Sequence, residues 1–135
     1  MNLFIDCGTN LGQGLKVFDK KYNLFNHPKW YIYTFEPNPY ILLNEMFKDV
    51  NNLTKMNKAV WINQDNLQFI CKGKKDKSMR EKYGEKRFQG GGSQLEETNK
   101  KYNIPSHVEA DYITVESINF SHFLKDNANK YNKII

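Results

Sequence analysis

Residues 2–14 read Asn-Leu-Phe-Ile-Asp-Cys-Gly-Thr-Asn-Leu-Gly-Gln-Gly, an apolar run followed at once by a glycine-rich turn. The run Leu3–Ile5 is too short for a helix, and its composition is typical of a buried parallel strand. Beyond the turn, Leu11, Leu15 and Phe18 recur at helical spacing. The stretch therefore predicts a strand, a turn and a helix, which is the opening unit of an α/β fold.

The turn has the features of a ligand-binding loop. Glycine lacks a Cβ atom and tolerates positive φ, so Gly8 and Gly12 let the backbone approach a bound molecule closely. We expect the loop amides and the N-terminus of the following helix to face that molecule. Asp6 ends the strand, and its carboxylate favours a ligand with positive charge or hydroxyl groups over a pyrophosphate. Asn10 also stands where a dinucleotide-binding turn has its second glycine.

A second unit of the same kind follows. Residues 30–35 are aromatic and β-branched, which predicts a strand, and this strand ends at Glu36-Pro37-Asn38-Pro39. We expect a helix to begin at Pro39 with Asn38 as its N-cap. Its apolar stripe would contain Leu42, Leu43, Met46 and Phe47. A right-handed crossover places the ends of the two strands side by side, so Glu36 is expected to accept hydrogen bonds from two ribose hydroxyls.

The remaining elements are predicted from shorter signals. Further strands are expected within residues 53–62, 67–71 and 112–115, and a short polar helix within 94–102. A second short helix is expected to contain Ile118, Phe120, Phe123 and Leu124. The final run, residues 131–135, begins a strand that should pair with the free edge of the first strand.

Length and composition indicate one intracellular domain. The chain has 135 residues, 20 Lys or Arg against 15 Asp or Glu, and a net charge of +5. Residues 72–87 carry this excess, because they contain eight basic and three acidic side chains. A basic segment attracts anionic partners such as nucleic acid, although such segments are more often solvated loops. We see no signal peptide, membrane span or Cys/His cluster, which predicts a cytoplasmic protein without a metal site.

Five segments resemble the FkbM-type methyltransferases in order and spacing: residues 4–12, 35–39, 57–60, 92–95 and 114–118. The pairing of the Asp-x-Gly-x-Asn-x-Gly turn with Phe-Glu-Pro-Asn-Pro is specific, whereas the later segments are weak alone. The family is described as S-adenosylmethionine-dependent O-methyltransferases on a Rossmann-like sheet. The resemblance implies this fold, this cofactor and a small-molecule or glycan hydroxyl acceptor.

The resemblance also implies the roles of individual residues. Asp6, Gly8, Asn10 and Gly12 would line the methionine part of the cofactor, and Glu36 would hold the ribose. Lys58 and Ala59 would lie by the adenine, and Ser93 on the substrate side near the transferred methyl group. The full expected cofactor-binding set is Asp6, Cys7, Gly8, Thr9, Asn10, Gly12, Glu36, Pro37, Lys58 and Ala59.

In the family, a further strand, an Asp-x-Glu-Gly stretch and the second half of the sheet follow at the point where this sequence stops. We therefore expect a class I methyltransferase fold truncated after the first half of its sheet, as a fragment or the product of a shortened gene. Residues 1–135 would form one partial domain with a basic, flexible insert at about 72–106. Alone they are expected to show no turnover.

Two other functions remain open from the residues. One is a non-catalytic remnant that binds nucleotide or nucleic acid through residues 72–87. The other is an NAD-dependent oxidoreductase, although the chain has no Tyr-x-x-x-Lys set. No general base is assigned, because His27, His107 and His122 each suit surface or packing roles better. The acceptor hydroxyl is equally open, since sugar, polyketide, lipid and peptide all fit.

Overall fold

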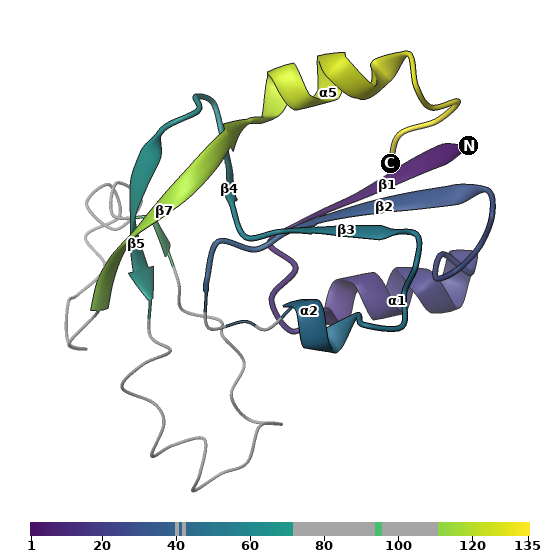
Figure 1. The fold of residues 1–135 in the computed structure, drawn as a ribbon, viewed down its shortest axis with the longest axis horizontal. Helices are drawn as coiled ribbons and strands as arrows, with labels where there is room; N and C mark the ends of the chain where they lie inside the picture. Colours follow the sequence, from purple (N-terminus) through teal and green to yellow (C-terminus); the bar gives the residue numbers. More distant parts are fainter. Residues whose placement is uncertain (40, 42, 72–93, 96–110) are drawn as a thin grey trace, which may run out of the picture.

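The computed structural model describes residues 1–39, 41, 43–71, 94–95 and 111–135 (Figure 1). Its elements are β1 (Asn2–Cys7), α1 (Gln13–Tyr22), β2 (Trp30–Phe35), α2 (Leu43–Met46), β3 (Leu53–Met56), β4 (Ala59–Trp61), β5 (Asn66–Cys71), β6 (Gln94–Leu95), β7 (Asp111–Asn119) and α5 (Phe120–Ala128). They form two sheets, ordered β1-β2-β3 and β4-β7-β5-β6. The predicted α/β class is confirmed.

The first sheet is parallel, and its register aligns the carboxyl ends of its strands. Cys7 pairs with Phe35, and Phe35 pairs with Met56. The other edge of β1 is also paired, because Leu3 N–H donates to the carbonyl of Lys133 (2.7 Å) and Ile5 N–H to that of Ile135 (2.8 Å). The expected pairing of the last residues with the first strand is therefore confirmed, and β1 is a central strand.

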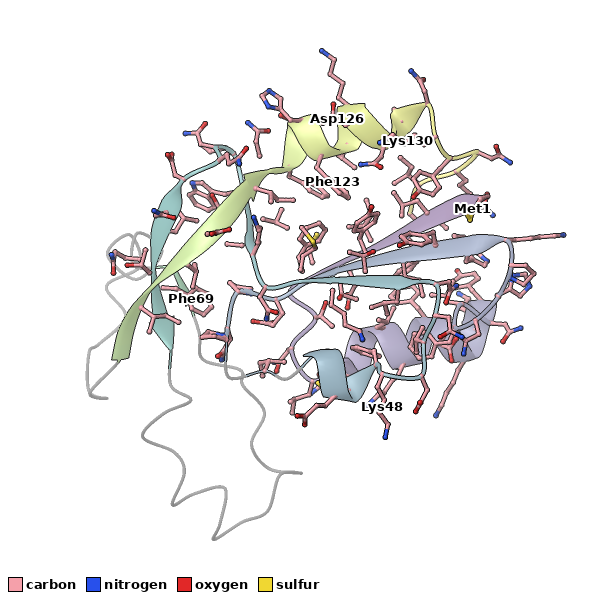
Figure 2. All side chains as sticks on the ribbon, in the orientation of Figure 1. Met1, Lys48, Phe69, Phe123, Asp126 and Lys130 are labelled. Atoms are coloured by element: carbon pink, nitrogen blue, oxygen red, sulfur yellow. The ribbon has the colours of Figure 1, made fainter. Side chains whose placement is uncertain are left out.

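Helices cover both faces of this sheet (Figure 1). On the face of α1 and α2, a buried cluster joins the strands to the helices; it contains Phe4, Leu15, Leu24, Ile32, Ile41 and Phe47. On the opposite face, the ring of Phe123 extends from α5 toward the strands (Figure 2). Its centroid lies 5.0 Å from that of Tyr33 and 5.3 Å from that of Phe35. Successive residues of β2, such as Ile32 and Tyr33, therefore point to opposite faces of the sheet, as alternation along a strand requires.

The second sheet is built around β7, which is parallel to β4 and antiparallel to β5. Ala59, Phe69 and Val115 are buried together on one face and form a small second core. The Ser117 hydroxyl joins the β4–β5 turn to β7, since its single proton is within reach of the carbonyls of Asn63 and Asp65 (both 2.9 Å) and its oxygen accepts from Asp65 N–H. No helix in the described part of the chain is long and apolar enough to cross a membrane.

Several element boundaries differ from the predictions. Residues 53–62 form two strands, because β3 pairs with β2 whereas β4 leaves that sheet to pair with β7. Ile118 belongs to β7. Residues Gln94 and Leu95 are a strand that pairs with β5, so the predicted polar helix is wrong there. The other residues of that predicted helix, 96–102, lie outside the described part of the chain. Residues 72–93 of the basic insert also lie outside it.

The second helix also differs. It begins at Leu43 and has four residues, so Asn38 is not its N-cap. Asn38 is buried instead, and its backbone N–H is bound by the Glu36 side chain. A proline after Asn38 restricts that residue to extended backbone, which delays the start of the helix.

At the amino ends of the strands, two asparagines join the α1–β2 connection to the turn before β3. The Asn52 amide group donates to the carbonyls of Leu24 (2.9 Å), His27 (3.4 Å) and Trp30 (2.8 Å). Its oxygen accepts from Asn26 N–H (2.8 Å), and the Asn26 oxygen accepts from Asn51 N–H (2.7 Å). Asn26 has φ 55°, a left-handed conformation that asparagine tolerates better than most residues.

Candidate functional site

The aligned carboxyl ends of β1, β2 and β3 bring most of the predicted site residues together. The turn after β1, residues 8–12, is here called the glycine loop. Gly8 N–H and Thr9 N–H both donate to the carbonyl of Phe35, at 2.8 and 3.1 Å. The glycine loop is therefore attached at its start to the end of β2.

Three residues of the glycine loop have positive φ: Gly8 (77°), Asn10 (47°) and Gly12 (72°). The two glycines meet different surroundings. A Cβ atom on Gly12 would lie 2.6 Å from Cζ of the buried Phe47 ring, so packing excludes a side chain there. A Cβ atom on Gly8 would have no described atom within 4 Å. Gly8 thus leaves open space at the carboxyl end of β1, on the side where a ligand would lie.

The carboxylate of Glu36 lies between the glycine loop and the residues that follow β2. Its side chain is buried, with only 6% of the residue exposed. Oε2 accepts the backbone N–H of Asn10 (2.7 Å), and Oε1 accepts that of Asn38 (2.8 Å). The backbone of Glu36 is held by β3 as well, since its N–H donates to the Met56 carbonyl (3.0 Å) and its carbonyl accepts from the Asn57 amide (3.4 Å).

Two acidic groups are therefore partly removed from water at this edge of the sheet. Burial raises the pKa of Asp6, and a smaller opposing contribution comes from the Thr9 hydroxyl. Burial also raises the pKa of Glu36, against the hydrogen bonds from Asn38 and Asn10, and the charge of Asp6 adds to the increase. Partial loss of hydration and the Asp6 charge raise the pKa of the Cys7 thiol, which is not in a disulfide, and this favours its neutral form.

The unused hydrogen-bonding groups of the site are acceptors. Asp6 Oδ2 and Asn10 Oδ1 are buried and have no hydrogen-bond partner in the described part of the chain. The amides of Gly8, Thr9, Asn10 and Gly12, in contrast, are all bound within the protein. Our expectation that the loop amides face a ligand is wrong for these four, because the end of β2 and the loop itself already use them. A buried acceptor without a partner costs free energy, so the site suits a ligand that donates.

Lys58 lies between the end of β3 and the start of β4, and Ala59 is the first residue of β4, in the second sheet. The Lys58 ammonium pairs with the Glu116 carboxylate (2.7 Å), and Ala59 is buried in the second core. A polar pocket of about 360 Å³ adjoins this ion pair; its lining residues are Lys58, Gln64, Asp65, Asn66, Glu116 and Ser117. Composition and periodicity carry no signal for this pocket, because its residues come from segments about 50 positions apart.

The other predicted residues are placed as follows. Pro37 directly follows Glu36 and is partly buried. His27 lies in the loop before β2, where its Nδ1 accepts from Lys29 N–H, and His122 is exposed on α5. Ser93 and His107 lie outside the described residues. Sequence analysis missed the part of Asn38 and Asn57 in holding Glu36, since only the tertiary fold brings these groups to its carboxylate and carbonyl.

A comparison with known protein families shows which family the chain belongs to. The profile described as the methyltransferase FkbM domain matches residues 6–134. The chain belongs to the FkbM methyltransferase family. The described site lies within the match, and methyl transfer is the general activity of the family. Neither the curated proteins nor the solved structures contain a match to this FkbM domain.

Proposed function

We propose that this FkbM domain binds S-adenosylmethionine at the carboxyl ends of β1 and β2 and serves the transfer of its methyl group to a hydroxyl oxygen. One observation carries the proposal: the site offers buried acceptors, Asp6 Oδ2 and Asn10 Oδ1, while its loop amides are already bound. The ammonium group of the cofactor supplies donors and positive charge, which this arrangement fits.

The residues would divide the cofactor between them. Asp6 and Asn10 would hold the ammonium end. Each carboxylate oxygen of Glu36 accepts one hydrogen bond from the protein and has a further lone pair, so Glu36 retains the capacity to accept from the ribose hydroxyls. When bound, S-adenosylmethionine supplies an already activated sulfonium methyl group. The chain's remaining task is to hold the acceptor oxygen about 3 Å from that carbon.

The same observation weighs against a dinucleotide. A pyrophosphate is bound by free backbone amides of the glycine-rich turn together with those at the start of the helix. Here Gly8, Thr9, Asn10 and Gly12 use their amides internally, and the carboxylates of Asp6 and Glu36 would repel phosphate.

Calorimetric titration with S-adenosylhomocysteine, NAD and a single-stranded oligonucleotide tests the proposal. We expect binding of S-adenosylhomocysteine alone, with Asp6→Asn weaker by about 1.5–3 kcal/mol, the range for hydrogen bonds to charged groups. Asp65→Asn, at the polar pocket, is the matched control and should retain the wild-type affinity. Binding of NAD without S-adenosylhomocysteine, or equal affinity of Asp6→Asn and wild type, would overturn the proposal.

A further inference from the structure

We propose that Glu36 is a positioning residue, whose carboxylate holds the glycine loop in its ligand-binding conformation before any ligand arrives. The nature of the ligand rests on the proposed function, but the holding of the loop does not. The geometry that carries the inference is the pair of hydrogen bonds from Glu36 to Asn10 N–H and Asn38 N–H. The bond to Asn10 joins the glycine loop to the segment after β2, 26 residues away in sequence, and the bond to Asn38 fixes the carboxylate within that segment.

The middle of the glycine loop needs such a partner. Its start is attached to the Phe35 carbonyl, and Gly12 N–H closes a turn onto the Thr9 carbonyl (2.7 Å). Asn10 lies between these points with φ 47°, a conformation that costs energy for a residue with a Cβ atom. Its N–H is held by Glu36 across the gap between the loops. Among the described residues, this is the hydrogen bond that holds Asn10, and it offsets the entropy cost of fixing the Asn10 backbone.

The position of Asn10 matters because its side chain carries one of the two unpartnered acceptors. Glu36 therefore places the Asn10 oxygen indirectly, through the backbone of the same residue. A site that is ordered before binding does not lose the entropy of ordering when the ligand arrives. On this account Glu36 acts on affinity in two ways, by its own free lone pairs and by the order that it imposes on the loop.

A carboxylate suits the task better than an amide. Both of its oxygens accept hydrogen bonds, whereas glutamine has one oxygen and an NH2 group. Glu36→Gln keeps the size of the side chain but presents a donor to one of the two backbone N–H groups. Glu36→Asp keeps the charge and shortens the side chain by one methylene, so it cannot reach both loops in the same geometry.

Amide hydrogen exchange of the ligand-free protein, followed residue by residue by NMR, tests the proposal. In Glu36→Ala, which removes both acceptor oxygens, we expect the Asn10 amide to exchange at least tenfold faster than in wild type. The amides of Phe4 and Ile32, inside β1 and β2, should keep their rates within about twofold. Glu116→Ala, at an exposed glutamate on β7, is the matched control and should leave Asn10 unchanged. Wild-type protection of Asn10 in Glu36→Ala would overturn the proposal, as would equal acceleration of all three amides.

A titration of the same proteins with S-adenosylhomocysteine separates this inference from the proposed function. Failure of the wild type to bind would overturn the proposed function, while the exchange rates would still decide the role of Glu36. Accelerated exchange in Glu36→Ala together with at least tenfold weaker binding supports both. Accelerated exchange with undiminished binding would overturn the claim that loop order contributes to affinity.

Discussion

Gly8 and Gly12 are four positions apart in one loop and have nearly the same φ, yet they meet different constraints. At Gly12 both the left-handed backbone and the Phe47 ring exclude a side chain. At Gly8 only the backbone conformation does, because the space beyond it is open. The residue type is therefore required at Gly12 by the fold, whereas at Gly8 it would also keep room for the proposed ligand.

The two alanine variants should separate these constraints. Gly8→Ala is expected to lower the free energy of unfolding by about 1–2 kcal/mol, the cost of a left-handed residue with a Cβ atom. Gly12→Ala should lose a further ~1–3 kcal/mol, because its methyl group overpacks the core at Phe47. Urea unfolding of both variants measures the difference. Equal destabilisation would show that the Phe47 ring moves aside without cost.

The raised pKa of Asp6 predicts a dependence of stability on pH. A raised pKa means that the folded state favours the protonated acid. Its contribution to stability is fully present below the unfolded pKa, roughly 4, and is lost as the pH rises through the higher folded value. Asp6→Asn removes this titration, so between pH 4 and 7 the variant should gain stability relative to wild type. Urea unfolding at several pH values measures this, and a pH-independent difference between the two proteins would contradict the assignment.

The sequence was sufficient to predict where Asp6 and Glu36 lie but not the contacts that they make. Asp6 and Glu36 were located correctly at neighbouring strand ends, because short apolar runs fix the strands and parallel order brings their ends together. The hydrogen bonds of Glu36 to Asn10 and Asn38 could not be predicted, since they depend on loop geometry rather than on periodicity. The Lys58–Glu116 pair was missed for a related reason: 58 positions separate its partners, and the split between β3 and β4 that brings them together has no signal in composition.

At the level of elements, the connections between strands determine the fold as much as the strands do. The α1–β2 connection and the turn before β3 have no regular structure to hold them, and the side chain of Asn52 bonds to three carbonyls and one N–H across them. Sequence patterns locate β2 and the start of β3 but give no information on such bonds. The first residue of β3 directly follows Asn52, so this side chain sets where the strand enters the sheet.

Asn52→Leu should show how much this network contributes. Leucine has a similar shape but neither donates nor accepts, which leaves backbone groups of Leu24, Trp30 and Asn26 without their partner. We expect a loss of about 2–3 kcal/mol in the free energy of unfolding, the cost of partly buried groups left unsatisfied. Asn51→Leu is the matched control, because Asn51 is exposed and its backbone bond to Asn26 is kept. Unfolding midpoints that coincide for the two variants would contradict a structural role for Asn52.

For the molecule as a whole, the feature that closes the first sheet is that residues 1–7 and 133–135 lie side by side. β1 begins the chain, and residues 133–135 run parallel to it on the edge opposite β2 (Figure 1). Between them the chain forms the entire second sheet and returns through α5, whose Phe123 packs on the face of β2. The last segment therefore closes the edge of the strand from which the glycine loop emerges.

Removal of residues 133–135 should open that edge. Leu3 N–H, Leu3 carbonyl and Ile5 N–H would lose their partners, which corresponds to about 2 kcal/mol at the modest net value of solvated backbone bonds. A free edge of an apolar central strand also pairs readily with other chains. We expect a lower unfolding midpoint in urea and concentration-dependent association by light scattering. Lys133→Ala is the control, because it keeps every backbone bond and should behave as wild type. A shortened chain that stays monomeric at unchanged stability would show that β1 is held by β2 and the helices alone.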